Sequence, residues 1–203
     1  MNKKPVLKCD FLYGAVNHRL RFGGGRRQHL PKAVGMKGGQ PPTIVDATAG
    51  LGRDAFLLAS LGSQVTLIER SEIIHELLVD GMEAARQAGG RHKDIIDRMT
   101  LIHGDSIKLL PKMRADVVLV DAMHPPRQKS ALVKAEMRAI RDIVGADEDQ
   151  HILVETALAI AKKRVVLKWP AKAAPLAGLR RASHQIIGKS IRYDVFLTSK
   201  GGR

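Results

Sequence analysis

The sequence is poor in cysteine, with Cys9 alone, and in aromatic residues, which make up 3% of its 203 residues. One cysteine cannot form an intramolecular disulfide, and the eight histidines show no metal-ligand spacing. No stretch approaches the ~18 apolar residues that a membrane span needs. The lysine-bearing N-terminus also lacks the apolar run of a secretory signal. These absences favour a soluble, cytoplasmic protein with no membrane association and no metal.

Acidic residues are nearly absent from both ends of the chain. Residues 1–45 hold nine Lys and Arg against one acid, and residues 162–203 hold eleven against one. Residues 46–161 hold fourteen against eighteen acids, so the net charge of +14 is concentrated at the ends. This distribution indicates a cofactor-binding or catalytic body flanked by a surface for a polyanion. Basic ends that only confer solubility would give the same pattern.

A basic segment rich in glycine and arginine, residues 1–40, precedes Pro41-Pro42. Its Gly23-Gly24-Gly25 triplet cannot lie inside a stable helix or strand, because three glycines cost too much backbone entropy. Arginines on both sides of the triplet suit contact with phosphates or splayed-out nucleotides, although a flexible linker is the alternative. The arginines concerned are Arg19, Arg21, Arg26 and Arg27.

Strand and helix patterns alternate through residues 41–203, which we expect to form the catalytic domain. Apolar runs predict strands at 43–47, 64–68, 99–102, 116–120 and 164–168, with shorter ones near 185–187 and 192–198. Helical periodicity predicts helices at 53–61, 71–87, 129–144 and 149–161. This order favours an α/β, Rossmann-like domain with a mainly parallel, doubly wound sheet.

The stretch TIVDATAGLGRD, residues 43–54, combines a buried strand, a glycine turn and a helix start. Asp46 ends the strand, Gly50 and Gly52 form the turn, and Arg53-Asp54 opens the helix. The glycine spacing also fits the dinucleotide pattern G-x-G-x-x-G/A, which is weak evidence by itself. The motif alone therefore leaves the identity of the cofactor open.

Four consecutive predicted strands end at or near an acid, namely Asp46, Glu69, Asp105 and Asp121. In doubly wound sheets ligands bind at the carboxyl ends of the strands, where these acids would share one rim. Glu69 lies where a carboxylate accepts hydrogen bonds from ribose hydroxyls, and Asp105-Ser106 suits the edge of an adenine. We expect an adenosine cofactor across the first three strand ends, and both NAD and S-adenosylmethionine fit this expectation.

The loop Asp121-Ala122-Met123-His124-Pro125-Pro126 distinguishes these cofactors. An exocyclic base amine has a delocalised lone pair, so its methylation requires acceptors for its N–H groups and a planar side chain that stacks on the base. Positioning of this kind supplies roughly 7–11 kcal/mol. A dehydrogenase has no evident use for such a loop. Asp121, His124 and Pro125 are the candidate catalytic residues, and Asp121 is the best candidate if a general base is used.

Several motifs together resemble the ribosomal RNA small subunit methyltransferase J family: HRLRFGGGR, VDATAGLGRDAF, LIER, LIHGDS, DAMHPPRQKSALVKAEMR and KRVVLKWP. The resemblance covers about residues 10–195. It implies a class I S-adenosylmethionine-dependent fold and methylation of guanine N2 in 16S RNA of the small ribosomal subunit. It also implies cofactor contacts at Arg53-Asp54, Glu69-Arg70, Asp105-Ser106 and Asp121. We expect RNA contacts at Arg19, Arg21, Arg26, Arg27 and Lys129.

The chain departs from the family pattern at three places. The family usually has proline where Ala122 stands, an aromatic where His124 stands, and two small hydroxyl residues where Asp105-Ser106 stands. The chain also begins close to the shared core, without the longer N-terminal extension of its relatives. These changes bear on efficiency and target, although an imidazole can still stack on a base.

Other functions stay open at this point. The chain could methylate another RNA base amine, such as adenine N6, or act as an RNA-binding ribosome-assembly factor that has lost the chemistry. An NAD-dependent oxidoreductase is a more distant alternative. Trp169 either lines the base pocket or packs in the core. A monomer is favoured.

Overall fold

The computed structural model describes residues 7–22, 24–121 and 149–198. The strands are β1 (Ile44–Asp46), β2 (Val65–Glu69), β3 (Met99–His103), β4 (Ala115–Asp121), β5 (Ala161–Pro170), β6 (His184–Ile187) and β7 (Ile191–Leu197). The helices are α1 (Gly14–Phe22), η1 (Gly25–Arg27), α2 (His29–Ala33), α3 (Arg53–Ser60), α4 (Glu72–Gln87), α5 (Gly90–Ile96), α6 (Ser106–Leu109), η2 (Leu110–Lys112) and α8 (Gln150–Ile160).

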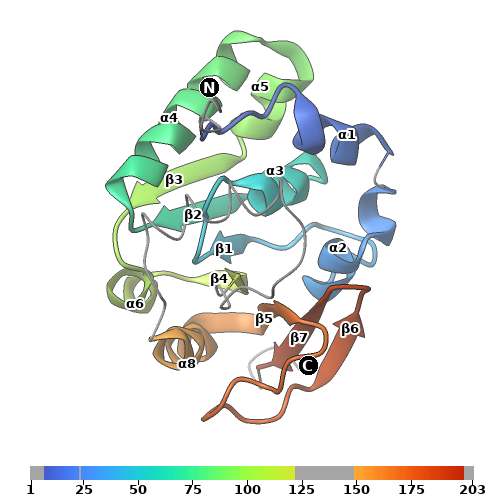
Figure 1. Ribbon diagram of the computed structural model, residues 1–203, viewed down its shortest axis with the longest axis vertical. Helices are drawn as coiled ribbons and strands as arrows, with labels where there is room; N and C mark the ends of the chain where they lie inside the picture. Colours follow the sequence, from blue (N-terminus) through green and yellow to red (C-terminus); the bar gives the residue numbers. More distant parts are fainter. Residues whose placement is uncertain (1–6, 23, 122–148, 199–203) are drawn as a thin grey trace, which may run out of the picture.

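The seven strands form one sheet in the order β3-β2-β1-β4-β5-β7-β6, and β3 to β5 in this order run from top to bottom in Figure 1. Strands β1 to β5 pair in parallel, whereas β7 runs antiparallel to both β5 and β6. The chain builds outward from β1 to β3 and then returns to place β4 on the other side of β1. The predicted doubly wound, mainly parallel sheet is confirmed, and its order reverses between β1 and β4.

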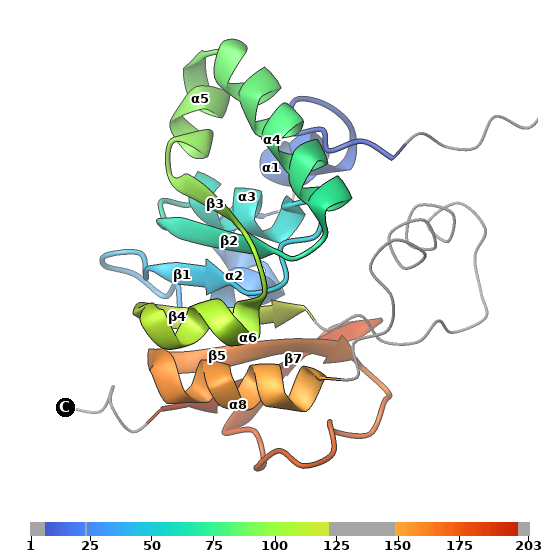
Figure 2. The same cartoon turned by 90° about the vertical axis from the view of Figure 1, so that its left-hand side faces the viewer.

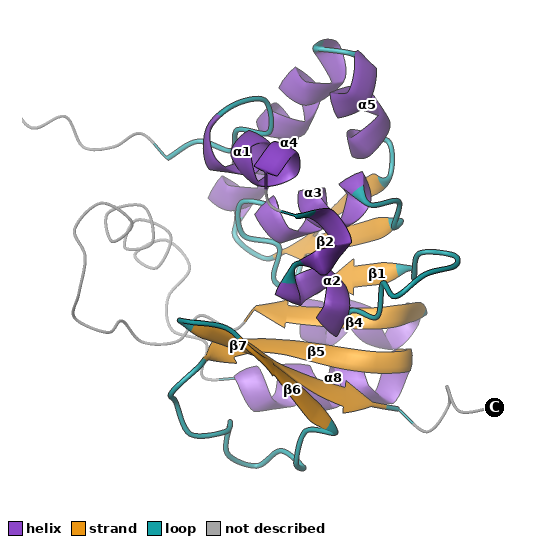
Figure 3. Ribbon diagram, turned by 90° about the vertical axis from the view of Figure 1, so that its right-hand side faces the viewer, coloured by secondary structure: helices purple, strands orange, loops and turns teal. Residues whose placement is uncertain are grey.

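Alternate residues of the central strands enter two separate cores, because successive side chains of a strand point to opposite faces. Ile44, Leu67 and Leu119 join one core with α1 to α5, whereas Val45 and Ile68 join the other with α8. Figure 2 shows α6 and α8 in front of the sheet, and Figure 3 shows α1 to α3 in front of it from the opposite side. Both faces are thus covered, which explains the near-continuous apolar runs of the strands.

The N-terminal segment packs on the same core as the rest of the chain. Phe11 stacks on Phe56 of α3 with ring centroids 4.8 Å apart, and Val16 and Leu30 are also buried in this core. Gly24 and Gly25 have φ angles of 81° and 54°, and they lead into the short helix η1. Helices α1 and α2 were not predicted, because tertiary packing rather than a clear periodic pattern stabilises them.

The predicted elements agree with the structure except at their ends and in short helices. Strand β5 is longer than predicted, because its pairing with β4 and β7 extends it from Ala161 to Pro170. The prediction missed α5, α6 and η2, which are too short for a periodic signal. The helix predicted at 129–144 lies outside the described residues. Among the described helices, none has the length and apolar character to cross a membrane.

Candidate active site

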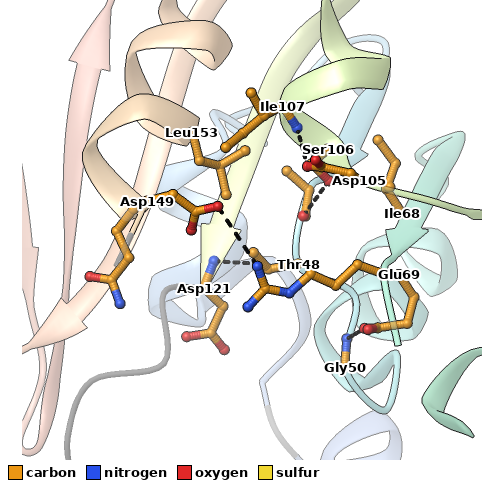
Figure 4. A pocket seen from close by; sticks show the side chains of 13 residues that line it. Thr48, Gly50, Ile68, Glu69, Asp105, Ser106, Ile107, Asp121, Asp149 and Leu153 are labelled. Atoms are coloured by element: carbon orange, nitrogen blue, oxygen red, sulfur yellow. Dashed lines mark hydrogen bonds and ion pairs between the residues drawn. The ribbon is translucent and has the colours of Figure 1, made fainter. Parts of the chain in front are cut away.

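A pocket lies at the carboxyl ends of β1, β2 and β4, where the strand order reverses (Figure 4). It encloses about 630 Å³ of empty space, part of it open to solvent. Its walls combine apolar side chains with carboxylates, and the lining residues that carry the argument are Ala47, Ile68, Glu69, Asp105, Asp121 and Leu153.

The glycine loop after β1 is held against the end of β2 by Glu69. The Gly50 amide donates to Glu69 Oε2 at 2.9 Å, and the Ser71 amide donates to Oε1 at 2.8 Å. Gly50 and Gly52 have φ angles of 52° and 68°, which favour glycine. A Cβ on Gly52 would also come within 2.8 Å of Leu78 Cδ2. Both glycines are therefore required by backbone conformation, and the Gly52 site has no room for a side chain.

The turn after β3 brings a carboxylate and a hydroxyl to the pocket. Asp105 caps α6, where its Oδ1 accepts from the Ile107 amide at 3.0 Å. The buried Ser106 hydroxyl donates to the Ala47 carbonyl at 2.6 Å, which fixes the end of β3 to the end of β1. Asp105 and Ser106 both line the pocket, as the prediction of a cofactor contact requires.

Thr48 connects the two strands at which the order reverses. Its amide donates to Asp46 Oδ1 at 3.2 Å, and its hydroxyl accepts from the Asp121 amide at 2.6 Å. Thr48 therefore sets where Asp121 leaves β4 relative to the glycine loop. No sequence pattern singles out Thr48, although it lies within the DATAG stretch.

An ion-pair cluster lies beside the pocket, formed by Asp54, Asp121, Lys168 and Arg19. The Lys168 Nζ is 2.6 Å from Asp121 Oδ2 and 2.8 Å from Asp54 Oδ2. Arg19 Nη1 is 2.6 Å from the other oxygen of Asp54, Oδ1. Burial alone would lower the pKa of Lys168, but the two carboxylates raise it well above its ordinary value. The ammonium group therefore stays charged.

The pKa values of the two carboxyl groups in this cluster shift in opposite directions. Burial would raise the pKa of Asp54, but Lys168 and Arg19 outweigh it and hold that pKa below its ordinary value. Burial raises the pKa of Asp121, an effect that the negative charge of Asp54 reinforces and Lys168 opposes. Asp54 is thus the more firmly ionised partner, and Lys168 lowers the pKa of Asp121 toward its ordinary value.

Asp46 lies behind the pocket wall and is only 2% exposed. Burial, with the negative charges of Asp54 and Asp121, raises its pKa to about 7. Its carboxyl oxygen Oδ1 accepts the Thr48 amide. Its place in the structure is therefore beneath the loop, where it supports the backbone that faces a ligand.

Helix α8 forms the wall of the pocket opposite the glycine loop. Asp149, Gln150 and Leu153 line the pocket from the start of this helix. The Arg70 guanidinium at the end of β2 is 3.8 Å from Asp149 Oδ2, an ion pair drawn in Figure 4. The α8 residues could not be assigned to the site from the sequence. A helical pattern predicts that a helix forms, but it does not predict which strand end lies next to the start of that helix.

The structure separates the predicted cofactor residues into two groups. Glu69, Arg70, Asp105, Ser106, Asp121 and Gly50 line the pocket. Asp46, Gly52, Arg53 and Asp54 lie in or beneath the glycine loop and the first turn of α3. Lys168 was missed, although a lysine inside the apolar strand pattern RVVLKW was a usable signal.

The predicted RNA-binding residues are more scattered. The half-buried Arg19 contacts Asp54 and Gln28, whereas Arg26 and Arg27 are exposed on η1. Arg26 Nη2 is 3.5 Å from the Leu61 carbonyl, at the end of α3 opposite to the glycine loop. The side chain of Arg21 and the residues His124, Pro125 and Lys129 lie outside what the structure describes.

Trp169 packs in the core that contains α8, where it is 5% exposed. Its indole Nε1 donates to the Ala174 carbonyl at 2.8 Å. Of the two interpretations left open by the sequence, the structure favours packing. Within the described ranges, no three His, Cys, Asp or Glu side chains gather as metal ligands do.

Comparison with known proteins places this chain in a family. The family model described as "Putative SAM-dependent methyltransferase" matches residues 1–198. A Brucella anthropi protein named ribosomal RNA small subunit methyltransferase J is 60% identical over 194 residues, which cover 96% of this chain and 95% of that protein. A protein of the same name from Agrobacterium fabrum is 60% identical over 188 residues, covering 93% and 90%.

A solved structure is similar over the whole chain. The SAM-dependent methyltransferase of Neisseria gonorrhoeae has a TM-score of 0.77 and 35% sequence identity, covering 100% of this chain and 78% of that one. The expected Rossmann-like class I fold and the S-adenosylmethionine cofactor are confirmed by these matches. This chain therefore belongs to the ribosomal RNA small subunit methyltransferase J family of S-adenosylmethionine-dependent methyltransferases.

Proposed function

We propose that this protein transfers a methyl group to N2 of a guanine in 16S RNA of the small ribosomal subunit, in the cytoplasm. The relatives' shared name supports an RNA of the small subunit as the substrate. The observation that carries the proposal is the pocket itself. It combines apolar side chains with the carboxylates of Glu69, Asp105 and Asp121, and it lies where the strand order reverses between β1 and β4.

The side chains of the pocket fit S-adenosylmethionine. Ala47, Ile68 and Leu153 provide apolar surface for an adenine, and Glu69 and Asp105 provide acceptors for hydroxyl and amino groups. When bound, the cofactor supplies an electrophilic methyl group on a positively charged sulfur. The carboxylates around the pocket complement that positive charge.

Asp121 is the residue that we assign to the target amine. Its carboxylate is 41% exposed at the end of β4 and faces the site from beside the pocket wall. An ionised carboxylate accepts the N–H groups of an exocyclic amine and so holds the nitrogen in one orientation. Held in this way, the N2 nitrogen would accept the methyl group that the cofactor supplies and would release one proton to solvent, while the electrons of the broken carbon–sulfur bond would stay on the sulfur.

The basic residues of the N-terminal segment provide the proposed contacts to RNA phosphates. Arg26 and Arg27 are exposed and adjacent, as phosphate ligands must be. They lie near the end of α3, a helix of eight residues that extends about 12 Å from the glycine loop. An RNA of several nucleotides spans this distance, so one strand can contact the arginines while its target base enters the pocket.

The experiment that tests this function uses labelled S-adenosylmethionine with small ribosomal subunits that lack the modification, with naked 16S RNA and with transfer RNA. Nucleoside analysis should find N2-methylguanosine in at least one small-subunit substrate. The Asp121→Ala variant should lose transfer and keep its RNA affinity, and Asp80→Ala on the exposed face of α4 is the matched control.

Each other result identifies an alternative. A labelled adenosine would show that the target is another base amine. Transfer to none of the three RNAs, with S-adenosylhomocysteine still bound, would contradict the proposed substrate. Absence of cofactor binding as well would leave the assembly-factor interpretation. A large loss of RNA affinity in Asp121→Ala would show that Asp121 contributes to binding rather than to transfer.

A further inference from the structure

Lys168 bridges two carboxylates that come from different elements. It lies beside Asp121 in the parallel pairing of β4 with β5, and its Nζ is 2.6 Å from Asp121 Oδ2. The same Nζ is 2.8 Å from Oδ2 of Asp54, in the first turn of α3. The Lys168 side chain is 21% exposed, so most of it is removed from water.

A lysine in this position is costly for the fold. Its side chain points to the same face of β5 as Val166, which is buried in the core that contains α1 to α5. A buried charge is tolerated only when it is paired, and a buried ion pair often contributes little net stability compared with apolar packing. The presence of this lysine is therefore better explained by its effect on the carboxylates than by stability.

The contacts of Asp54 extend the cluster to the N-terminal segment. Arg19 of α1 binds the free oxygen of Asp54, Oδ1, at 2.6 Å, and its Nε donates to Gln28 Oε1 at 2.9 Å. The ion pairs of Lys168 and Arg19 thus join helix α3, the end of β4 and helix α1. A change in the position of α1 would move Arg19 relative to Asp54, and it would therefore change how strongly Asp54 attracts Lys168.

Charged and titratable groups approach Asp121 from five elements. They are Asp46 of β1, Asp54 of α3, Lys168 of β5, Tyr193 of β7 and, through Asp54, Arg19 of α1. Three carboxyl groups thus share two cations. Among the described residues, Arg19 is the other cation in an ion pair with this cluster, and it binds Asp54 rather than Asp121.

We propose that Lys168 is a positioning residue for methyl transfer, which fixes the orientation and negative charge of the Asp121 carboxylate, with Asp54 and Arg19 joining it to the N-terminal segment. This inference rests on the proposed function. Lys168 itself contacts no part of the target base. It acts through Asp121, which accepts the amine hydrogens only while it is charged and turned toward them.

The test compares the full-length protein with Lys168→Met, Lys168→Arg and Asp54→Asn, each assayed for methyl transfer from pH 5.5 to 9 at saturating cofactor. Lys168→Met should lower kcat near neutral pH by about 100-fold, as misplacement of a positioned group does. KM for RNA should stay unchanged. The acid limb of its pH profile should move to higher pH, and Lys168→Arg should recover most of the lost rate.

Asp54→Asn should move the acid limb in the opposite direction. It removes a negative charge close to Asp121 and leaves Lys168 to Asp121 alone, so the carboxylate ionises more readily. A residue that only supports the fold would not give opposite shifts in the two variants. The thermal unfolding midpoint shows that each variant is folded, and binding of S-adenosylhomocysteine shows that its cofactor site is intact.

A carboxyl NMR titration of Asp121 gives a readout that does not depend on activity. In Lys168→Met the Asp121 resonance should titrate at higher pH than in the parent protein, and in Asp54→Asn at lower pH. Identical titrations in all three proteins would overturn the inference. If the parent protein transfers no methyl group to any RNA, the proposed function fails, and the titration still decides whether Lys168 controls the charge of Asp121.

Discussion

The Gly50 amide donates a hydrogen bond to Glu69 Oε2 at 2.9 Å, so the carboxylate that ends β2 also holds the loop that follows β1. The other carboxylate oxygen, Oε1, accepts the Ser71 amide at 2.8 Å. Glu69 therefore both shapes the glycine loop and lines the pocket. Removal of the Glu69 carboxylate would affect both roles at once, so it should have a large effect on the affinity for the cofactor.

We expect Glu69→Ala to weaken binding of S-adenosylhomocysteine by about 10- to 100-fold, because hydrogen bonds to a charged group contribute roughly 1.5–3 kcal/mol. Glu69→Gln keeps one acceptor oxygen and should lose less. Isothermal titration calorimetry measures both, with Glu76→Ala on the exposed face of α4 as the control. An unchanged dissociation constant in Glu69→Ala would exclude Glu69 as a cofactor ligand.

The contribution of Asp46 to the stability of the protein should fall as the pH rises between the pKa of its carboxyl in the unfolded chain and its pKa in the native protein. Below its unfolded value of 3.8 the carboxyl is protonated in both states, and between 3.8 and about 7 only the native state keeps the proton. The contribution of Asp46 to the free energy of unfolding then decreases with pH, because this group binds more protons in the native state than in the unfolded chain. Above about pH 7 this cost is complete.

Asp46→Asn cannot ionise and should lack that decrease. Its stability relative to the parent protein should therefore rise between pH 4 and pH 7, on the order of 4 kcal/mol for a shift of this size in a buried group. Guanidinium unfolding across this range measures the difference, and Asp80→Asn is the exposed control. A difference that does not depend on pH would show that Asp46 ionises in the native protein as it does in the unfolded chain.

Replacement of both Arg26 and Arg27 by glutamine should weaken RNA binding without changing cofactor affinity. Loss of two phosphate contacts to a single strand should reduce the slope of log K against log salt by about 1.4. The control is the double variant Arg86→Gln and Lys93→Gln, which has the same charge change and loses cations that pair with Asp97. Equal salt slopes in the parent and the Arg26/Arg27 variant would leave residues 23–27 as a linker without RNA contacts.

Gly81→Ala should destabilise the protein although alanine favours helices. A Cβ on Gly81 of α4 would lie 2.7 Å from the Cys9 carbonyl oxygen and 2.9 Å from Cys9 Sγ. Relief of this contact requires the backbone near Cys9 to move, and overpacking of this kind typically costs about 1–3 kcal/mol. Thermal or denaturant unfolding measures the loss. The adjacent exposed variant Asp80→Ala should change stability by less than about 0.5 kcal/mol, and an equally stable Gly81→Ala would contradict the close packing.

The sequence by itself determined the parts of this protein that local pattern encodes. Apolar runs and helical periodicity predicted the sheet and its longer helices, because burial on both faces produces those patterns directly. The carboxylates Glu69, Asp105 and Asp121 were predicted to share one rim, since parallel strands bring their carboxyl ends to the same edge. The motifs also identified the family, which the comparisons confirmed.

Only the tertiary structure decided which distant residues complete the site. Lys168 pairs with Asp54 and Asp121. Thr48 is hydrogen-bonded to Asp121 and Asp149 pairs with Arg70, all over separations that no local pattern encodes. The same holds for Arg19, which the sequence suggested as an RNA ligand and the structure pairs with Asp54. Strand register and helix packing bring these charges together, and a sequence pattern specifies neither until the chain is folded.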